Sequence, residues 1–302
     1  MTRSGLMAGI TQGKPKIHST LNRLPMEKEF WNQLAKNEYK IPDGNTLHDL
    51  TKTIFGYLGN VDPDLRDEIA YIVYANWLKR DMYSPDEIRL HIAELLANLE
   101  KGIGEIESDS VFLRAFSVLF LAEIVHNDNK KSVLEQADIS SIFDKGLQYL
   151  DAEKDPRGFV PVKGWAHALA HTADLMMVLG KNRYIGKDEL EKFLQGIAAK
   201  LIHSANWIYI HGEDERLANA VIAIFERNLL SLDFIELWLA SFTSPERSWI
   251  GAYMDEDVAK AFHNTRNFLR SLSEAVQKAE GLPNKEALMQ ITQQASTNLK
   301  SY

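Results

Sequence analysis

The stretch GWAHALAHTADLMMVLG, residues 164–180, is apolar on almost every side of a helix and carries one narrow polar stripe. At about 100° per residue, His167, His171 and Asp174 fall within about 60° of one another. Leucine, methionine, tryptophan and alanine occupy most of the remaining surface. Since a helix that is apolar nearly all round is buried, we expect this segment inside a helical core.

The rest of the chain repeats a helical pattern, with apolar residues at spacings of three and four. The predicted helices cover 27–38, 46–59, 64–80, 85–101, 110–127, 132–154, 164–179, 187–204, 214–229, 231–242, 245–280 with a break, and 284–299. Ser84 and Glu87 have the spacing of a capping box. The best candidate strand, WIYIH at 207–211, has no partner. We therefore predict an all-α fold without a significant sheet: an irregular α-α superhelix of antiparallel helix pairs, of the HEAT or armadillo type.

The first 25 residues differ from the rest of the chain. They contain no acidic residue and are rich in glycine, serine and threonine. We expect residues 1–25 to be a disordered leader, either a native tail or a remnant of the expression vector; an organelle-targeting peptide is the alternative. From Met26 to residue 302 we expect a single helical-repeat domain.

The composition indicates a soluble, cytoplasmic protein without thiol chemistry. The chain is 45% hydrophobic and 25% charged, and it has no cysteine, which excludes disulfides and cysteine-ligated metals. Its longest apolar run is interrupted by Arg114 and Glu123, so we expect no membrane span. The net charge of -8 disfavours nucleic acid. We expect no cofactor; the partner, a protein or a small molecule, and the oligomeric state stay open.

The polar stripe allows three interpretations. Histidines four residues apart can reach one metal ion, and Asp174 could be a third ligand. However, Ala168 stands where a zincin helix has its glutamate. The stripe could instead line a metal-free pocket, or it could be a hydrogen-bonded core in which Asp174 accepts from His171 and both histidines bond to backbone.

The preceding loop, DAEKDPRGFVPVKGW at 151–165, could add polar groups to such a pocket. Lys163 and Gly164 stand at the predicted helix N-terminus, where free amides favour an anion. Arg157 could add a bidentate donor, and Trp165 opens the helix beside them. The alternative is an ordinary solvated connector.

Two further segments carry candidate residues. Arg114, if buried, needs a carboxylate from another helix, and the candidates are Asp174, Glu215 and Asp155; otherwise its side chain reaches water at the helix edge. In HGEDERLANA, 211–220, Arg216 could pair with Glu213 three residues earlier. Alternatively, Glu215 or Arg216 faces the His167 stripe.

The segments EKDPRGFVPVKGWAHALAHTADL, VFLRAFSVLFLA and GEDERLANA together resemble the bacterial domain of unknown function 2785 family. The resemblance runs from about Met26 to about Arg270. It implies a soluble all-α superhelical protein from a low-GC Gram-positive bacterium that starts at Met26, and it implies no roles for individual residues. Ala115 departs from the serine usual in the family. The signature positions are Arg114, Arg157, Gly158, Lys163, Gly164, Trp165, His167, His171, Asp174, Glu215 and Arg216.

Two hypotheses of function follow. The first is a non-enzymatic helical scaffold that binds a protein segment or a small anionic ligand at a polar pocket around the 164–180 helix. The second is a hydrolase or metal-assisted enzyme that uses His167, His171 and Asp174, with Glu153 or Glu215 nearby.

Overall fold

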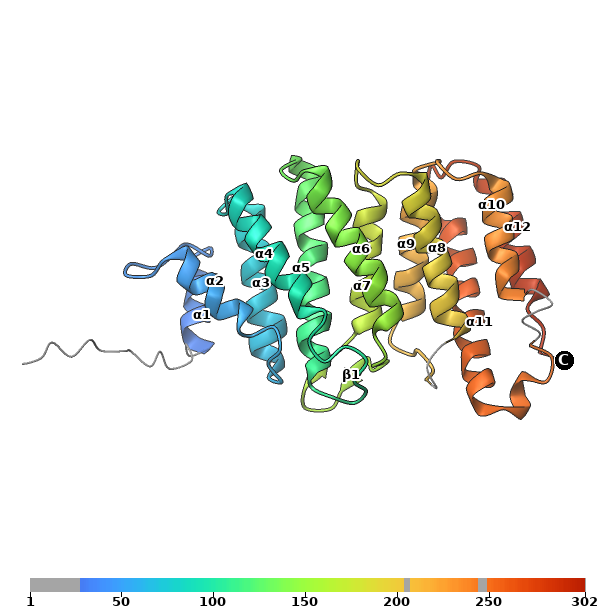
Figure 1. Cartoon of the computed structure of the whole chain (residues 1–302), viewed down its shortest axis with the longest axis horizontal. Coiled ribbons are helices and arrows are strands. Elements are labelled where there is room, and N and C mark those ends of the chain that lie inside the picture. Colours follow the sequence, from blue (N-terminus) through green and yellow to red (C-terminus); the bar gives the residue numbers. More distant parts are fainter. Residues whose placement is uncertain (1–27, 204–206, 244–248, 302) are drawn as a thin grey trace, which may run out of the picture.

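The structure is a computed structural model that describes residues 28–203, 207–243 and 249–301. Within these ranges the chain forms a row of twelve α-helices, from α1 at the N-terminal end to α12 at the C-terminal end (Figure 1). Their bounds are α1 Lys28–Lys36, α2 Leu47–Phe55, α3 Ile72–Lys79, α4 Pro85–Asn98, α5 Ser110–Lys131, α6 Gln136–Ala152, α7 Ala168–Gly180, α8 Lys187–Ile202, α9 Glu213–Glu226, α10 Leu232–Ala240, α11 Glu256–Lys278 and α12 Lys285–Asn298. The shorter elements are the π-helix η1 Asp64–Tyr71, the strands β1 Phe159–Val160 and β2 Gly164–Trp165, and the 3-10 helices η2 Ser241–Thr243 and η4 Ala252–Met254.

The helices pack in two layers. Helices α5, α7, α9 and α11 lie side by side in one layer, and α4, α6, α8 and α10 contact one another in the second. The apolar faces of both layers share one buried cluster that extends from Trp31 to Leu299. The predicted all-α fold is therefore confirmed, while the likeness to HEAT or armadillo repeats stays a prediction.

Helix α5 is the centre of this core. By length and composition it could cross a bilayer, but 72% of its apolar window is buried inside the structure. It packs along α7, whose residues are also mostly buried. The apolar character of both helices is thus used against neighbouring helices, as in the core of a globular protein.

Several predicted boundaries change, each for a local reason. The capping box is confirmed, since the Glu87 carboxylate accepts the Ser84 backbone N–H at 2.8 Å. The helix predicted from 132 begins at Gln136, because Ser132 ends α5 in the left-handed conformation, with φ 55°. The 64–80 helix starts as η1 before α3, and 207–211 is irregular rather than a strand. Residues 1–25, 204–206 and 244–248, on which parts of the predictions fall, lie outside the described ranges.

Candidate functional site

A two-stranded hairpin stands where the sequence predicted the first turn of a helix. Strands β1 and β2 pair antiparallel, with Phe159 opposite Trp165 and their ring centroids 5.0 Å apart. Beyond the strands, the His167 N–H donates to the Arg157 carbonyl at 3.1 Å. Helix α7 therefore begins at Ala168, and the expected helix N-terminus at Lys163 and Gly164 is wrong. The predicted anion site at these two residues depended on free amides of a helix N-terminus, so it is wrong as well.

Glycine is required in this hairpin by close contacts. Gly164 has φ +77°, and a Cβ there would lie 2.7 Å from the Pro63 Cβ. A Cβ at Gly158 would lie 2.2 Å from the His211 Nδ1. The chain before η1 and the segment before α9 thus press directly on the hairpin backbone, which explains two of the glycines in the signature.

His167 is a buried imidazole in an aromatic cluster. It adopts φ 52° at the N-cap of α7 and is 6% exposed. Its ring stacks on Trp165 with centroids 4.2 Å apart and lies 6.2 Å from the ring of His211. Burial, together with Arg216 and His211, lowers the pKa of His167 to about 4, so the ring is neutral near pH 7. Its buried Nε2 has no hydrogen-bond partner within the described residues.

His171 lies one turn deeper and is held by the backbone of α5. Its Nδ1 is 3.2 Å from the Ala115 carbonyl oxygen, and since a carbonyl only accepts, Nδ1 carries the proton. Its ring also meets Phe116 edge-on, with centroids 5.1 Å apart. Burial, with His167 nearby, lowers the pKa of His171 to about 3. The predicted bond from a histidine to backbone is therefore present for His171.

Asp174 pairs with Arg216 of α9 rather than with His171. Burial raises the pKa of Asp174, and the Arg216 guanidinium partly offsets this rise. The predicted pairing of Arg216 with Glu213 is wrong: the Glu213 carboxylate accepts the His211 N–H at 2.8 Å instead. Arg216 thus reaches the stripe, whereas Glu215 is exposed and faces a groove between α9 and α11.

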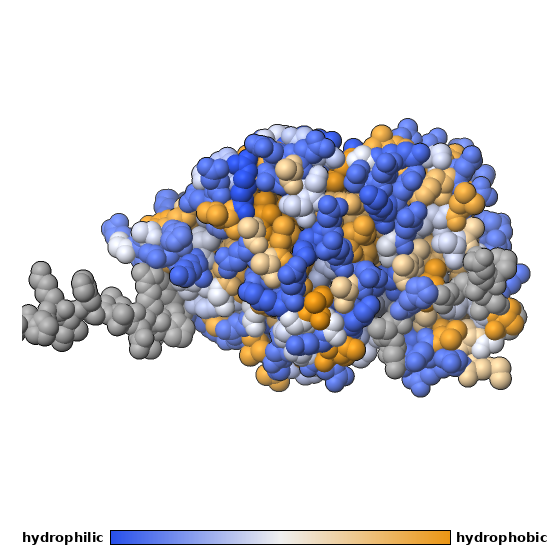
Figure 2. Space-filling view, in the orientation of Figure 1, coloured by the Kyte–Doolittle hydropathy of each residue, from blue (hydrophilic) through white to orange (hydrophobic). Residues whose placement is uncertain are grey.

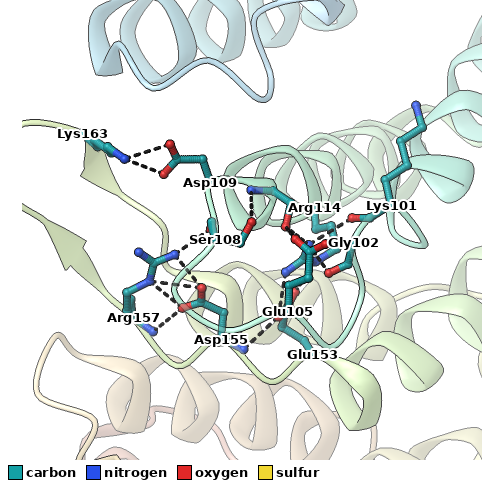
Figure 3. A network of polar contacts seen from close by, with 11 residues as sticks. Lys101, Gly102, Glu105, Ser108, Asp109, Arg114, Glu153, Asp155, Arg157 and Lys163 are labelled. Atoms are coloured by element: carbon teal, nitrogen blue, oxygen red, sulfur yellow. Dashed lines mark hydrogen bonds and ion pairs between the residues drawn. The ribbon is translucent and has the colours of Figure 1, made fainter.

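Arg114, Glu153, Asp155 and Arg157 form a continuous ionic network on the other side of the hairpin (Figure 3). Arg114 has no exposed surface, and its Nε donates to Glu153 at 2.6 Å. Burial lowers the pKa of Arg114, but the Glu153 carboxylate more than offsets this, so the pKa lies above its ordinary value. The predicted partners of Arg114, Asp174, Glu215 and Asp155, are wrong, and so is the alternative that it reaches water.

Nearby aspartates neutralise both cations that were expected to bind an anion. Arg157 binds Asp155 at 2.6 Å and also donates to the Ser108 carbonyl at 2.7 Å. Lys163, at the hairpin turn, binds Asp109 at 2.7 Å. Both side chains hold the loop before α5 against the hairpin, and this leaves little charge for a free anion at this place.

Arg66 is the residue that the sequence reasoning missed. It is fully buried in η1, and its guanidinium lies 4.3 Å above the Phe112 ring. It donates to the Lys163 carbonyl at 2.8 Å and to the Trp165 carbonyl at 3.3 Å. The sequence predicted only a helix over 64–80 here, and a buried arginine bound to distant carbonyls leaves no mark in a local pattern.

The predicted metal ligands do not converge. Each of the three side chains is turned to a different neighbour: His167 to Trp165, His171 to Ala115 and Asp174 to Arg216. Among the described residues, no group of three histidine or carboxylate side chains is placed to hold one metal ion. The arrangement is a neutral aromatic cluster beside an ion pair.

A family model for proteins of unknown function, DUF2785, matches residues 99–273. The match covers the network, the hairpin and the histidine cluster, while the resemblance of residues 26–98 stays a prediction. No curated protein and no solved structure matches the chain. With more than half of its length matched, the chain belongs to the DUF2785 family, whose function is unknown.

Proposed function

We propose that this protein is a helical binding scaffold and that a protein segment binds to the exposed face of its hairpin. We call this face the hairpin surface and define it as Phe159, Val162 and Trp165. The observation that carries the proposal is Trp165, which is 40% exposed although its ring stacks on a buried histidine and a buried arginine holds its carbonyl.

The hairpin surface is apolar and open to solvent. Phe159 is 49% exposed and Val162 is 94% exposed at the turn. Hydrophobic side chains gather at the lower centre of Figure 2, where Figure 1 places the hairpin. Contiguous apolar surface of this kind is typical of interaction sites, and tryptophan is among the residues that contribute most to binding energy.

The surface is also held rigid before any partner arrives. Arg66 fixes the β2 backbone from beneath, and Arg157 and Lys163 tie the hairpin to the loop before α5. Val162 keeps φ +69°, a conformation that costs a β-branched residue free energy. Because the hairpin is already ordered, binding a partner would cost little conformational entropy at this site.

Charge around the surface favours a partner with basic and apolar side chains over a small anion. Arg157 and Lys163 are both neutralised by aspartates. Glu107 is exposed in the neighbouring loop and lies near enough to act on Arg157 by charge, without an ion pair within the described residues. An arginine or lysine beside an apolar anchor would therefore meet a favourable potential, whereas an anion would not.

A display library of random peptides tests the proposal. Peptides are selected on the wild-type protein, and their affinities are then compared with those for Trp165→Ala. We expect selected peptides to combine apolar and basic residues and to bind Trp165→Ala about tenfold or more weakly. Tyr253→Ala, which removes an aromatic side chain 52% exposed elsewhere, is the matched control and keeps the wild-type affinity.

Equal affinity of the selected peptides for wild type and Trp165→Ala contradicts the proposal. Selection of acidic peptides instead contradicts the charge argument. Because Trp165 is half exposed, both variants are expected to fold, and circular dichroism verifies this.

The second hypothesis, a hydrolase or metal-assisted enzyme at His167, His171 and Asp174, stays a prediction. His171 is turned to a backbone carbonyl and Asp174 to a guanidinium, so the pair lacks the mutual contact that a general base and its orienting carboxylate share. Elemental analysis of protein purified without chelators tests the metal form of this hypothesis: a stoichiometric transition metal lost in His167→Ala would revive it.

A further inference from the structure

A groove with a volume of about 390 Å³ lies between α6 and α8, in the second helix layer. Its apolar floor includes Leu147 and Leu150 of α6. Gly196 of α8 packs on both, since a Cβ there would lie 3.0 Å from Leu150 and 3.1 Å from Leu147. The two helices are therefore in tight contact beneath the groove, and its walls are their longer side chains. This volume is in the range of small-molecule sites.

Three lysines surround this floor: Lys154, Lys192 and Lys200. Asp151 is the carboxylate in the lining, so the groove carries an excess of two positive charges (three minus one) in a chain with a net charge of -8. Lysines elsewhere on the same helices are neutralised: Lys145 binds Glu100 and Lys187 binds Glu191. The groove is a local exception to an acidic surface.

None of the three ammonium groups forms an ion pair within the described residues. Lys154 donates to the Asp151 carbonyl at 2.9 Å, and Lys200 donates to the Glu153 carbonyl at 2.6 Å. Neither carbonyl carries a formal charge, and Lys192 is exposed at the rim. A partly buried ammonium that forms no ion pair is costly. Burial and the adjacent Lys154 lower the pKa of Lys200 to about 8, and the nearby Glu153 and Asp151 carboxylates only partly oppose this. A bound anion would remove this cost.

We infer that the groove binds a small organic phosphate, with the phosphate between Lys154, Lys192 and Lys200 and the organic part on Leu147 and Leu150. A phosphate monoester carries a charge of about −2 and three acceptor oxygens, which match the excess charge and the three donors. A carboxylate offers one charge and two oxygens, so it would leave one ammonium unpaired. This site lies apart from the hairpin surface and does not depend on it.

Isothermal titration calorimetry with phenyl phosphate, inorganic phosphate, benzoate and phenol tests the site. We expect phenyl phosphate to bind one per chain, at least about tenfold more tightly than inorganic phosphate or benzoate, and phenol to show no binding. Lys192→Gln and Lys200→Met should each weaken phenyl phosphate about tenfold or more. Lys187→Gln, with the same charge change on α8 outside the groove, should bind as the wild type does.

Phenyl phosphate that binds Lys192→Gln and Lys187→Gln equally well overturns the site. No heat of binding in the wild type overturns it too, and equal affinity for benzoate and phenyl phosphate overturns the assignment to phosphate. Lys192 is exposed, so its variant decides the matter even if Lys200→Met does not fold. Peptide binding at the hairpin surface is measured on the same variants and should not change, which separates this site from the proposed function.

Discussion

Two polar clusters flank the hairpin, and they differ in how completely they are paired. Before β1, the guanidinium of Arg114 uses all three of its nitrogens on Glu153, backbone carbonyls and Ser110. After β2, His167 Nε2 and His211 Nδ1 are buried without a hydrogen-bond partner within the described residues. Every charged group of the first cluster has a partner of opposite charge, and in this sense we call it saturated. In the second cluster two imidazole nitrogens have no partner.

This difference indicates a division of labour. A saturated ionic network fixes geometry, and the loss of one member leaves a charge buried and alone. Unpaired imidazole nitrogens contribute little to stability, because each gave up water without gaining a partner. We interpret the first cluster as the support of the hairpin and the second as the underside of the surface that binds. The predictions below test this contrast.

The largest effect is expected for Arg114→Met. The substitution keeps much of the apolar stem but leaves the buried Glu153 carboxylate without its counter-charge. We expect the free energy of unfolding to fall by about 3–5 kcal/mol, measured by urea denaturation.

Arg89→Met is the matched control, because Arg89 is itself partly exposed and two of its partners, Asp86 and Glu135, are exposed. It should cost much less than Arg114→Met. Adding Glu153→Gln to Arg114→Met should recover part of the loss, since the double variant removes the isolated charge. A loss no larger than that of the Arg89 variant would show that the network is not a support.

Acid should destabilise the folded protein through the histidine cluster. The folded-state pKa values of His167 and His171, about 4 and about 3, lie below the value of about 6.5 in an unfolded chain. The unfolded state therefore binds more protons, and stability is complete above pH 6.5 and lost as pH falls towards the folded values. By linkage, each histidine accounts for about 2 kcal/mol lost at pH 5.

His171→Leu isolates one of these contributions. The variant should lose about 2 kcal/mol less than the wild type between pH 7 and pH 5, measured by denaturation at both pH values. His126→Leu, on an exposed position of α5, is the control and should follow the wild-type profile. A profile unchanged in His171→Leu would mean that this imidazole is not kept neutral by the fold.

Gly158→Ala tests the contact between the hairpin and the histidine cluster. Its Cβ would meet the His211 ring at 2.2 Å, so this ring, whose centroid lies 5.6 Å from that of Trp165, must shift. We expect a cost of about 1–3 kcal/mol, typical of overpacking, and a shifted tryptophan fluorescence spectrum. Gly186→Ala, whose Cβ meets only the flexible end of Glu189 at 3.2 Å, should change neither. If the two variants behave alike, contact with His211 does not explain why position 158 is a glycine.

The smallest effect is expected for Lys163→Gln. Lys163 and Asp109 are both partly exposed, and their ion pair is screened by water. We expect a loss of about 0.2–1 kcal/mol that shrinks in high salt. Asp109→Asn should give a similar loss, and the double variant should add little to either. A loss of unfolding free energy as large as that of Arg114→Met would show that Lys163 supports the fold as strongly as the saturated network does.

Local patterns predicted the helices well, and long-range contacts account for most of the errors. The capping box at Ser84 lies within four residues of sequence, and its bonds are local. The start of α7 was wrong because β2 is formed by pairing with β1 and by Arg66, which lies about a hundred residues earlier. Two strands of two residues each are too short to produce an alternating pattern.

Part of the candidate site was also visible in the sequence. The stripe predicted that His167, His171 and Asp174 share one face, and the structure places His171 against backbone as one interpretation required. The partner of Arg114 was wrong because three carboxylates were considered and Glu153, at the end of α6, was not among them. Charge alone does not show which of several carboxylates, on different helices, the fold brings next to Arg114.

The sequence by itself determined the class of fold and the burial of the 164–180 segment, because helix periodicity and apolar content act over a few residues. The tertiary structure decided which charges meet, because each pairing depends on how far helices distant in sequence turn towards one another. This packing pairs Arg157 and Lys163 with aspartates that support the hairpin. It leaves Trp165 exposed, and it leaves three lysines in the groove between α6 and α8 available to bind a ligand.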